Sequence, residues 1–181
     1  GIPGMPGRKE GEYLTHREGD EAELLIRNWA KADQPFFLHL ANYAVHTPIQ
    51  ALPEVAAKYQ QEGKSEQNAK YAAMVESVDD ATGQVIRALE ETGLLKQTVI
   101  VFTSDNGGLD RNGGPTENAP LRSGKGYAYE GGIRVPFIVR WPGVVPAGSE
   151  SDAPVCSVDI FPTVLEGAEV TLPKEYCLLY T

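Results

Sequence analysis

Two stretches in the first half of the chain place apolar residues at helical spacing. In the first stretch, the residues that share one helical face at i, i+3, i+4 and i+7 are Ala22, Leu25, Ile26 and Trp29. Asp20 is suited to cap such a helix, and Glu23, three residues later, completes a capping box. We therefore predict a helix that begins at Asp20.

The second stretch is longer and begins at Asn68. The apolar stripe of this predicted helix consists of Tyr71, Val75, Val78, Thr82, Val85 and Leu89. Gly93 fits the C-terminal end of the helix, because glycine readily adopts the left-handed conformation found there. A short helix through Ala56 and Tyr59 is predicted upstream, after a loop with two prolines.

Three short apolar runs predict strands. The runs "PFFLHLANY" (35–43) and "TVIVFTSD" (98–105) do not alternate cleanly between apolar and polar residues, so both are expected to be buried on both faces. The third run, "IRVPFIVRWPG" (133–143), contains Pro136, which predicts an edge strand or a bulge.

The remaining segments complete an α/β pattern. Residues 107–126 are rich in Gly, Asn and Pro and are predicted to form a loop, and "SVDIFPTVLEGA" (157–168) predicts a short helix. The order of elements predicts an α/β fold in one domain over 1–181, with a polar loop over 1–12 and an atypical tail over 171–181. Ligands of such folds bind beyond the carboxyl ends of the strands. Three polar clusters lie after the predicted strands or in the loop between them: "NYAVHTPIQ", "SDNGG" and "LRSGKGYAYEGGIRVP".

Composition excludes some classes of partner. The net charge of -9 argues against a nucleic-acid partner, because binding of phosphates needs a basic face. No apolar run approaches the length that spans a membrane. The two cysteines, Cys156 and Cys177, have no CxxC spacing and are expected to be free, buried thiols.

The stretch "SDNGG" has two interpretations. An Asn-Gly pair favours a type I′ hairpin turn, but the following "GLDRNGGPTENAP" is not a partner strand. The alternative is a site for a hard cation, because the carboxylate of Asp105 and the amide oxygen of Asn106 are oxygen donors that suit calcium or magnesium.

His46 and Lys125 are the other candidates for chemistry. His46 follows a predicted strand, so it is either structural or an acid able to protonate a leaving group; His16 and His39 are weaker candidates. Lys125 lies between two glycines and is either an exposed loop lysine or a cation that binds an anionic oxygen.

Motifs that bind nucleotide phosphates do not account for Lys125. The P-loop pattern fails because Ala119 replaces its first glycine, and the GxGxxG pattern fails at Tyr129. We expect Glu130 and Arg134 to pair across the intervening glycines and hold this loop, which is a structural role.

Taken together and in this order, these motifs resemble the type I sulfatases, the arylsulfatase-like enzymes that depend on formylglycine. The resemblance lies in "HTPIQA", "YAAMVESVDDATGQVIRALEETGLL", "FTSDNGG", "LRSGKGYAYEGGIRVPFIVRWPG" and "SVDIFPTVL", and covers roughly residues 13 to 170. It implies part of an alkaline-phosphatase-like α/β sandwich, a mixed sheet flanked by helices, that hydrolyses sulfate esters of small molecules or carbohydrates. It further implies that Asp105 and Asn106 are calcium ligands, that His46 is a general acid and that Lys125 binds sulfate.

The chain also departs from this family. The Cys/Ser-x-Pro/Ala-x-Arg motif that becomes formylglycine is not found in it, and the two further acidic calcium ligands of the family lie upstream of that motif's position. We therefore expect a C-terminal fragment of the catalytic domain that is inactive alone and holds calcium weakly, since calcium takes about six to eight oxygens. Sheet edges exposed by the missing strands predict self-association or a partner chain.

Two other functions remain open. A phosphate or phosphonate ester hydrolase of the same superfamily would have a similar metal site, although the order "SDNGG", "GKG", "EGG" favours a sulfatase. A non-catalytic module that binds calcium or an anion would also lack turnover. Family members are often periplasmic, secreted or lysosomal, which gives the compartment by analogy alone.

Overall fold

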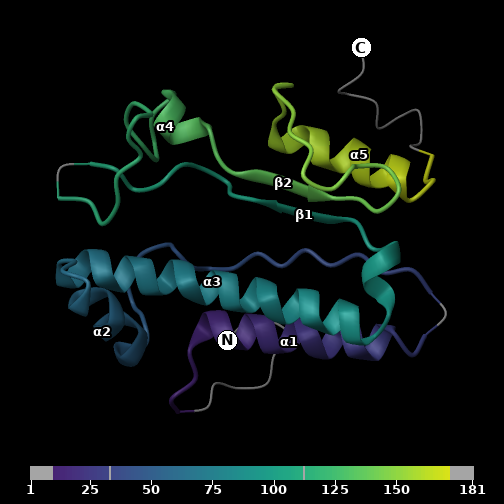
Figure 1. Cartoon of the computed structure of the whole chain (residues 1–181), viewed down its shortest axis with the longest axis horizontal. Helices are drawn as coiled ribbons and strands as arrows, with labels where there is room; N and C mark the ends of the chain where they lie inside the picture. Colours follow the sequence, from purple (N-terminus) through teal and green to yellow (C-terminus); the bar gives the residue numbers. More distant parts are fainter. Residues whose placement is uncertain (1–9, 33, 112, 172–181) are drawn as a thin grey trace. The chain divides into compact units, whose positions relative to one another are not determined.

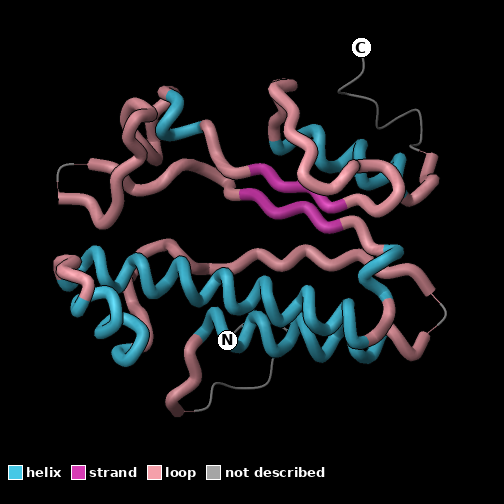
Figure 2. Tube along the Cα trace, viewed as in Figure 1, coloured by secondary structure: helices cyan, strands magenta, loops and turns pink. Residues whose placement is uncertain are grey.

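The computed structural model describes residues 10–32, 34–111 and 113–171. The chain divides into two compact units, Gly1–Val145 and Pro146–Thr181. The elements of the first unit, shown in Figures 1 and 2, are α1 (Leu14–Trp29), α2 (Pro53–Gln61), α3 (Glu66–Glu91), the 3-10 helix η1 (Leu94–Gln97), β1 (Ile100–Thr103), α4 (Glu130–Ile133) and β2 (Phe137–Arg140). The second unit contains the 3-10 helix η2 (Ser157–Asp159) and α5 (Ile160–Gly167).

Helix α1 begins earlier than the prediction placed it. It starts at Leu14, with Tyr13 at the N-cap, so the prediction that Asp20 caps this helix is wrong. The polar first turns are helical because they pack on α3, and Asp20 lies within the helix, where its Oδ1 accepts a hydrogen bond of 2.9 Å from Gln84 Nε2. Leu25, predicted to face the core, is 38% exposed.

Close packing between α1 and α3 depends on small side chains. A methyl group built on Gly19 would lie 3.1 Å from Ala81 Cα, so the two helices approach each other at this point. Further along, Ile26 of α1 packs in one cluster with Ala88 and Leu89 of α3. These contacts fix the direction of α3, and therefore the position of the strand that follows it.

The prediction of a long helix ending near Gly93 is confirmed. Ser65 caps α3, because its Oγ accepts a hydrogen bond of 3.3 Å from Asn68 N, and Gly93 has a φ of 76°, in the left-handed region that ends the helix. The stripe that is buried differs from the predicted one: Val75 is 49% exposed. The buried residues of α3 are Ala69, Ala73, Met74, Ser77, Ala81, Ala88 and Leu89.

The sheet of the described residues has two strands. β1 and β2 are antiparallel, with Val101 opposite Val139, and Pro136 immediately precedes β2, where it disturbs no ladder hydrogen bond. Both strands are half-buried or exposed rather than buried on both faces. The sheet in the described part of the chain is this antiparallel pair, and not the mixed sheet that was predicted.

Residues 35–43 form no strand, contrary to the prediction. The segment is extended, but a strand needs a hydrogen-bonded neighbour, and the described ladder joins β1 to β2 alone. Its burial alternates: Leu38 and Leu40 are half-buried, whereas Phe37 is 72% exposed. The expectation that both faces are buried is therefore wrong for this segment.

The second unit confirms the predicted short helix over 157–168. Asp159 Oδ2 accepts a hydrogen bond of 2.7 Å from Cys156 N at its start. Cys156 is a free thiol but is exposed, so the expectation of burial is wrong because η2 and α5 leave it at the surface. Cys177, nearly all of the tail over 171–181, and positions 1–9 of the loop predicted over 1–12 lie outside the described residues.

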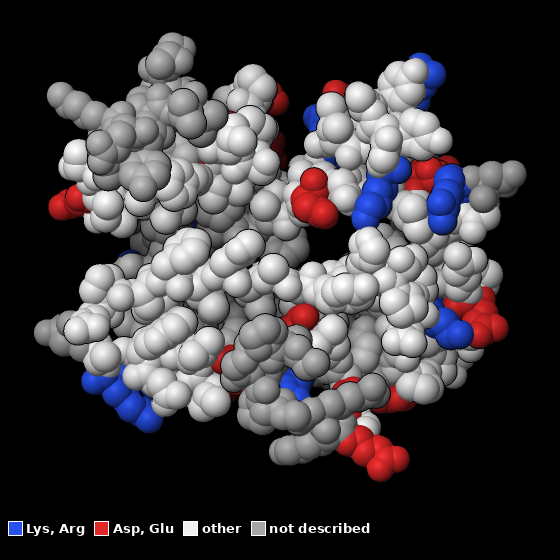
Figure 3. All heavy atoms as spheres, turned by 180° about the vertical axis from the view of Figure 1, so that it is seen from behind, with Lys and Arg blue, Asp and Glu red and all other residues white. Residues whose placement is uncertain are grey.

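Charged side chains of both signs share the molecular surface. On the face in Figure 3, Lys and Arg side chains are interspersed with Asp and Glu side chains. None of the described helices combines the length and the apolar character that crossing a bilayer requires.

Candidate functional site

The end of β1 leads directly into the candidate cation ligands. Ser104 Oγ donates a hydrogen bond of 2.9 Å to Asn106 O, which turns the chain out of the strand. Asn106 Nδ2 donates to Gly107 O at 3.1 Å, so the amide nitrogen is engaged and Oδ1 is the atom suited to a cation. Asp105 is exposed and Asn106 is half-buried. Because β1 pairs with the distant β2, the hairpin interpretation of this Asn-Gly pair is wrong.

The two glycines that follow allow close backbone packing. Gly107 N donates a hydrogen bond of 3.0 Å to Gly132 O, and a methyl group on Gly107 would overlap the Gly131 carbonyl oxygen. Gly108 O accepts hydrogen bonds from Asp110 N at 2.8 Å and from Lys125 N at 2.9 Å. The Gly108 carbonyl therefore joins the segment that carries Asp105 and Asn106 to the segment that carries Lys125.

Asn118 organises this region through its side-chain amide. Its Nδ2 lies 3.0 Å from Gly108 O, 3.1 Å from Ser123 O and 3.1 Å from Gly131 O, so its two hydrogens are shared among three carbonyls. Its backbone N donates to Asp110 Oδ2 at 2.9 Å. One side chain thus ties two loop segments, at Gly108 and Ser123, to α4.

Sequence reasoning missed Asn118. A lone Asn in a loop rich in Gly and Pro is typical of turns, and the sequence holds no sign that its amide would reach three carbonyls. The glycines that permit this arrangement are visible in the sequence, but the group they surround is not.

Lys125 is half-buried and its backbone is held between two glycines. Gly124 is buried, and a methyl group there would lie 2.8 Å from Asn118 Nδ2; Gly126 has a φ of 91°, which disfavours other residues. The Lys125 backbone is therefore held by the packing of Gly124 on Asn118 and by the hydrogen bond from Lys125 N to Gly108 O.

The ion pair predicted between Glu130 and Arg134 is present. Arg134 Nη1 lies 3.2 Å from Glu130 Oε2 across α4, a short helix that the sequence did not predict. The two side chains are 59% and 71% exposed, so the pair contributes little to stability. Its role in holding the loop stays a prediction. Nearby, the Arg122 guanidinium lies 3.7 Å from the centre of the Tyr129 ring, a cation–π contact.

His46 is exposed and is oriented by its neighbours. Its Nδ1 lies 3.0 Å from Thr47 O; because a carbonyl only accepts, Nδ1 carries the hydrogen and Nε2 is the nitrogen available for proton transfer. The imidazole contacts the Tyr43 ring edge-on at 5.7 Å, and Tyr43 Oη donates to Thr47 O at 2.9 Å.

Glu18 supports the segment that carries His46. The side chain lies in α1, the residue is 8% exposed, and its two carboxylate oxygens accept from Tyr43 N at 3.3 and 3.4 Å. Burial raises the pKa of this carboxyl, and the Tyr43 hydrogen bond opposes that effect. Sequence reasoning missed Glu18, although its spacing to Ala22 and Ile26 at i, i+4 and i+8 places it on the buried face.

The structure brings two of the three polar clusters together. Asp105 and Asn106 are joined to Lys125 through Gly108, whereas the described contacts of His46 are with Tyr43 and Thr47. Within the described ranges, no group of three or more His, Cys, Asp or Glu side chains is arranged to hold a metal. Assignment of Asp105 and Asn106 as calcium ligands therefore stays a prediction.

Comparison with known proteins gives a consistent result. The model of the family described as Sulfatase matches residues 4–170. A protein of Formosa agariphila named Sulfatase is 38% identical over 175 residues, which are 90% of this chain and 31% of that protein. The steryl-sulfatase of Rattus norvegicus is 41% identical over 169 residues, which are 90% of this chain and 28% of that protein.

Two solved structures resemble this chain over nearly its whole length. The crystal structure of Ps i-CgsB in complex with k-i-k-neocarrahexaose superimposes with a TM-score of 0.87 at 37% identity, covering 95% of this chain and 38% of that one. A second crystal structure of Ps i-CgsB gives a TM-score of 0.88 at 36% identity. The chain spans about a third of the length of the relatives that it matches, 31% and 28% of the two proteins above.

Proposed function

Because the chain belongs to the sulfatase family and has its alkaline-phosphatase-like α/β fold, we propose that it carries the sulfate-binding and leaving-group part of the active site of a sulfuric ester hydrolase. The observation that carries this proposal is the link through Gly108 O. That carbonyl accepts from Lys125 N at 2.9 Å and so holds the lysine beside the segment of Asp105 and Asn106. An anion and a cation bound there would be neighbours.

His46 acts as the general acid in this proposal. The hydrogen on Nδ1 is held by Thr47 O, so the proton that His46 gives to the leaving oxygen of the ester comes from Nε2. The Tyr43 ring and Thr47 orient the imidazole for this transfer.

Lys125 binds an oxygen of the sulfate group. Its ammonium acts as a point charge on an oxygen whose negative charge grows in the transition state, and the fixed backbone on either side limits reorganisation. The buried Gly124 lets the backbone before Lys125 pack against Asn118, which holds the lysine in place.

The residues at the end of β1 fit calcium as part of its ligand set. Asp105 supplies a carboxylate, and Asn106 supplies the amide oxygen that remains when its nitrogen donates to Gly107 O. When bound, calcium would hold sulfate oxygens in place. Further acidic ligands are needed for tight binding, so this chain alone would bind calcium weakly.

Turnover requires a nucleophile that this sequence does not contain. Formylglycine, generated in the family from a Cys/Ser-x-Pro/Ala-x-Arg motif, supplies the attacking oxygen, and the 181 residues hold no such motif. We therefore expect the isolated chain to be inactive. A phosphate or phosphonate ester hydrolase is the alternative within the superfamily, but the named relatives are sulfatases.

Hydrolysis of an aryl sulfate tests the proposal. In the complete product of the gene, His46→Ala should lower kcat by about 10²- to 10⁴-fold and Lys125→Ala by about 10²- to 10³-fold. His39→Ala and Lys31→Ala, at exposed positions, are the matched controls and should have little effect. Robust turnover by the 181-residue chain, or a preference of the complete protein for aryl phosphate, would contradict the proposal.

A further inference from the structure

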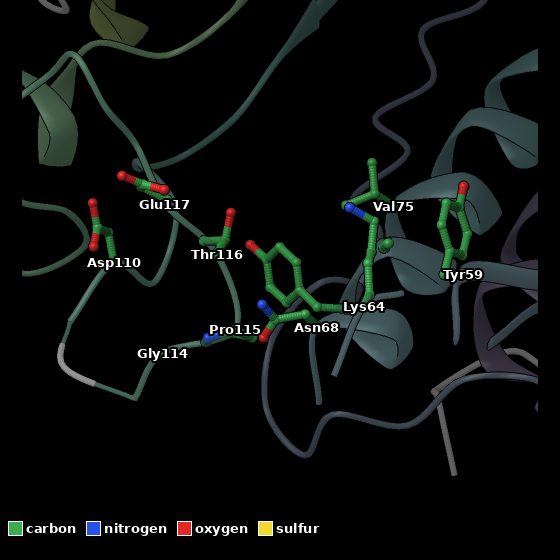
Figure 4. A pocket seen from close by; sticks show the side chains of 11 residues that line it. Tyr59, Lys64, Asn68, Val75, Asp110, Gly114, Pro115, Thr116 and Glu117 are labelled. Carbon is green, nitrogen blue, oxygen red and sulfur yellow. The ribbon is translucent and has the colours of Figure 1, made fainter. Parts of the chain in front are cut away.

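An open groove of about 730 Å³ lies between the first turns of α3 and the loop that follows Gly108 (Figure 4). Its volume is in the range of about 300–1,000 Å³ that is usual for small-molecule sites. The side chains that line it and enter the argument are Tyr59, Lys64, Asn68, Tyr71, Thr116 and Glu117.

This groove lies at the same end of the fold as the candidate site. The chain reverses at Gly93 through η1, so the first turns of α3 and the carboxyl end of β1 lie at one end (Figure 1). A methyl group on Gly108 would lie 2.8 Å from Thr116 Cγ2, so the wall of the groove packs on the residue whose carbonyl holds Lys125.

The lining combines aromatic rings with hydrogen-bonding groups. Burial raises the pKa of Tyr71, so its hydroxyl stays protonated and can donate. Tyr59 Oη donates to Glu76 Oε2 at 2.7 Å, which holds that ring in place. Asn68 offers an amide, and Thr116 a hydroxyl. Rings beside short polar side chains suit a ligand with apolar faces and many hydroxyl groups.

The charge of the groove disfavours a second anion. Lys64 is positive, whereas Asp110 and Glu117 are negative, and Asp110 also accepts a hydrogen bond of 2.9 Å from Asn118 N. We propose that the groove is a subsite for an unsulfated sugar ring, adjacent to the ring whose sulfate meets Lys125. This inference rests on the proposed function and specifies its substrate as a carbohydrate of at least two rings.

Titration of the 181-residue chain, followed by two-dimensional amide NMR with calcium present, tests the inference. Lactose serves as the unsulfated probe and galactose 6-sulfate as the sulfated one. Lactose should shift the amides of Asn68, Tyr71 and Thr116 in a saturable way. Asn68→Ala should raise the Kd for lactose by about fivefold or more, the effect of one lost hydrogen bond. Glu117→Gln should also raise it, because a neutral amide oxygen is a weaker acceptor for a sugar hydroxyl than a carboxylate.

Gln67→Ala, at an exposed neighbouring position of α3 outside the groove, is the matched control and should leave the Kd unchanged. The inference is overturned if lactose shifts no groove amide, if Asn68→Ala and Glu117→Gln bind it as well as the parent chain, or if inorganic sulfate saturates the groove. Galactose 6-sulfate separates the two proposals, because a missing shift at Lys125 would count against the proposed function and leave the lactose result valid.

Discussion

Replacing Asn118 by Asp is the sharpest test of how the candidate site is built. The two side chains have the same shape, but the carboxylate has no hydrogen to give to Gly108 O, Ser123 O or Gly131 O, and it places negative charge against three carbonyls. The backbone hydrogen bond from Asn118 N to Asp110 remains.

The size of the effect follows from those contacts. Gly108 O keeps its hydrogen bonds from Asp110 N and Lys125 N, so the loss falls on Ser123 O and Gly131 O. An acceptor that loses its partner costs about 1–3 kcal/mol when buried, and Asn118 is half-buried, so a total of about 2–3 kcal/mol is expected. The cost falls on the loop and not on the helices, because α1 and α3 hold each other through contacts far from Asn118. Local opening of the loop should therefore become about 30- to 150-fold more frequent.

Amide hydrogen exchange measures this opening directly. Lys125 N, which donates to Gly108 O, and Gly131 N, which donates to Arg122 O, report on the loop, and Ala88 N reports on α3. In Asn118→Asp, protection should fall at Lys125 and Gly131 and stay unchanged at Ala88. Asn28→Asp adds the same charge at an exposed position of α1 and should leave loop protection unchanged.

Asn118→Ala separates loss of the donor from addition of charge, and should weaken protection less than Asn118→Asp. Equal protection of Lys125 in Asn118→Asp and the parent chain would refute the role of the amide. Uniform loss of protection in α3 and the loop would refute the claim that the effect is local.

Two other predictions concern α1. Gly19→Ala should lower the free energy of unfolding by about 1–3 kcal/mol in urea denaturation, because the added methyl would lie 3.1 Å from Ala81 Cα; an unchanged midpoint would contradict the close helix approach. Glu18→Gln should remove part of the pH dependence of stability. Because the pKa of Glu18 is raised in the folded chain, the folded chain binds this proton more tightly than the unfolded chain does. The parent chain therefore loses stability as the pH rises from the ordinary pKa of Glu through the raised one. If the curves of stability against pH run parallel for the parent chain and Glu18→Gln, Glu18 has the same pKa in the folded and the unfolded chain, which would contradict this prediction.

Local signals predicted the extent of α3. Apolar residues at helical spacing from Asn68 and Gly93 at the C-terminal end were enough, because periodicity and caps are properties of the segment itself, although the buried stripe differs and the Ser65 cap was not predicted. The same rules misplaced the start of α1, since its polar first turns are helical through packing on α3, a tertiary contact that no local pattern encodes.

Strands were harder to predict because a strand is defined by its neighbour. Residues 35–43 have the composition of a buried strand but lie extended without a described ladder partner, and β1 pairs with a strand more than thirty residues later. For the site, the chemistry of Asp105, Asn106 and Lys125 was visible in the residue types. Their connection through Gly108 and Asn118 could not be predicted. It depends on backbone carbonyls, which every residue carries and which therefore leave no mark in the sequence.

The coding sequence upstream of Gly1 in the source organism tests the central claim most directly. If this chain carries the sulfate-binding and leaving-group part of a sulfatase site, the upstream codons should contain a Cys/Ser-x-Pro/Ala-x-Arg motif preceded by a pair of aspartates. His46, Asp105, Asn106 and Lys125 would then have the nucleophile and the remaining calcium ligands that they need. A start codon directly before Gly1, or an upstream region that lacks this motif and offers a Thr or Ser nucleophile in its place, would contradict the account.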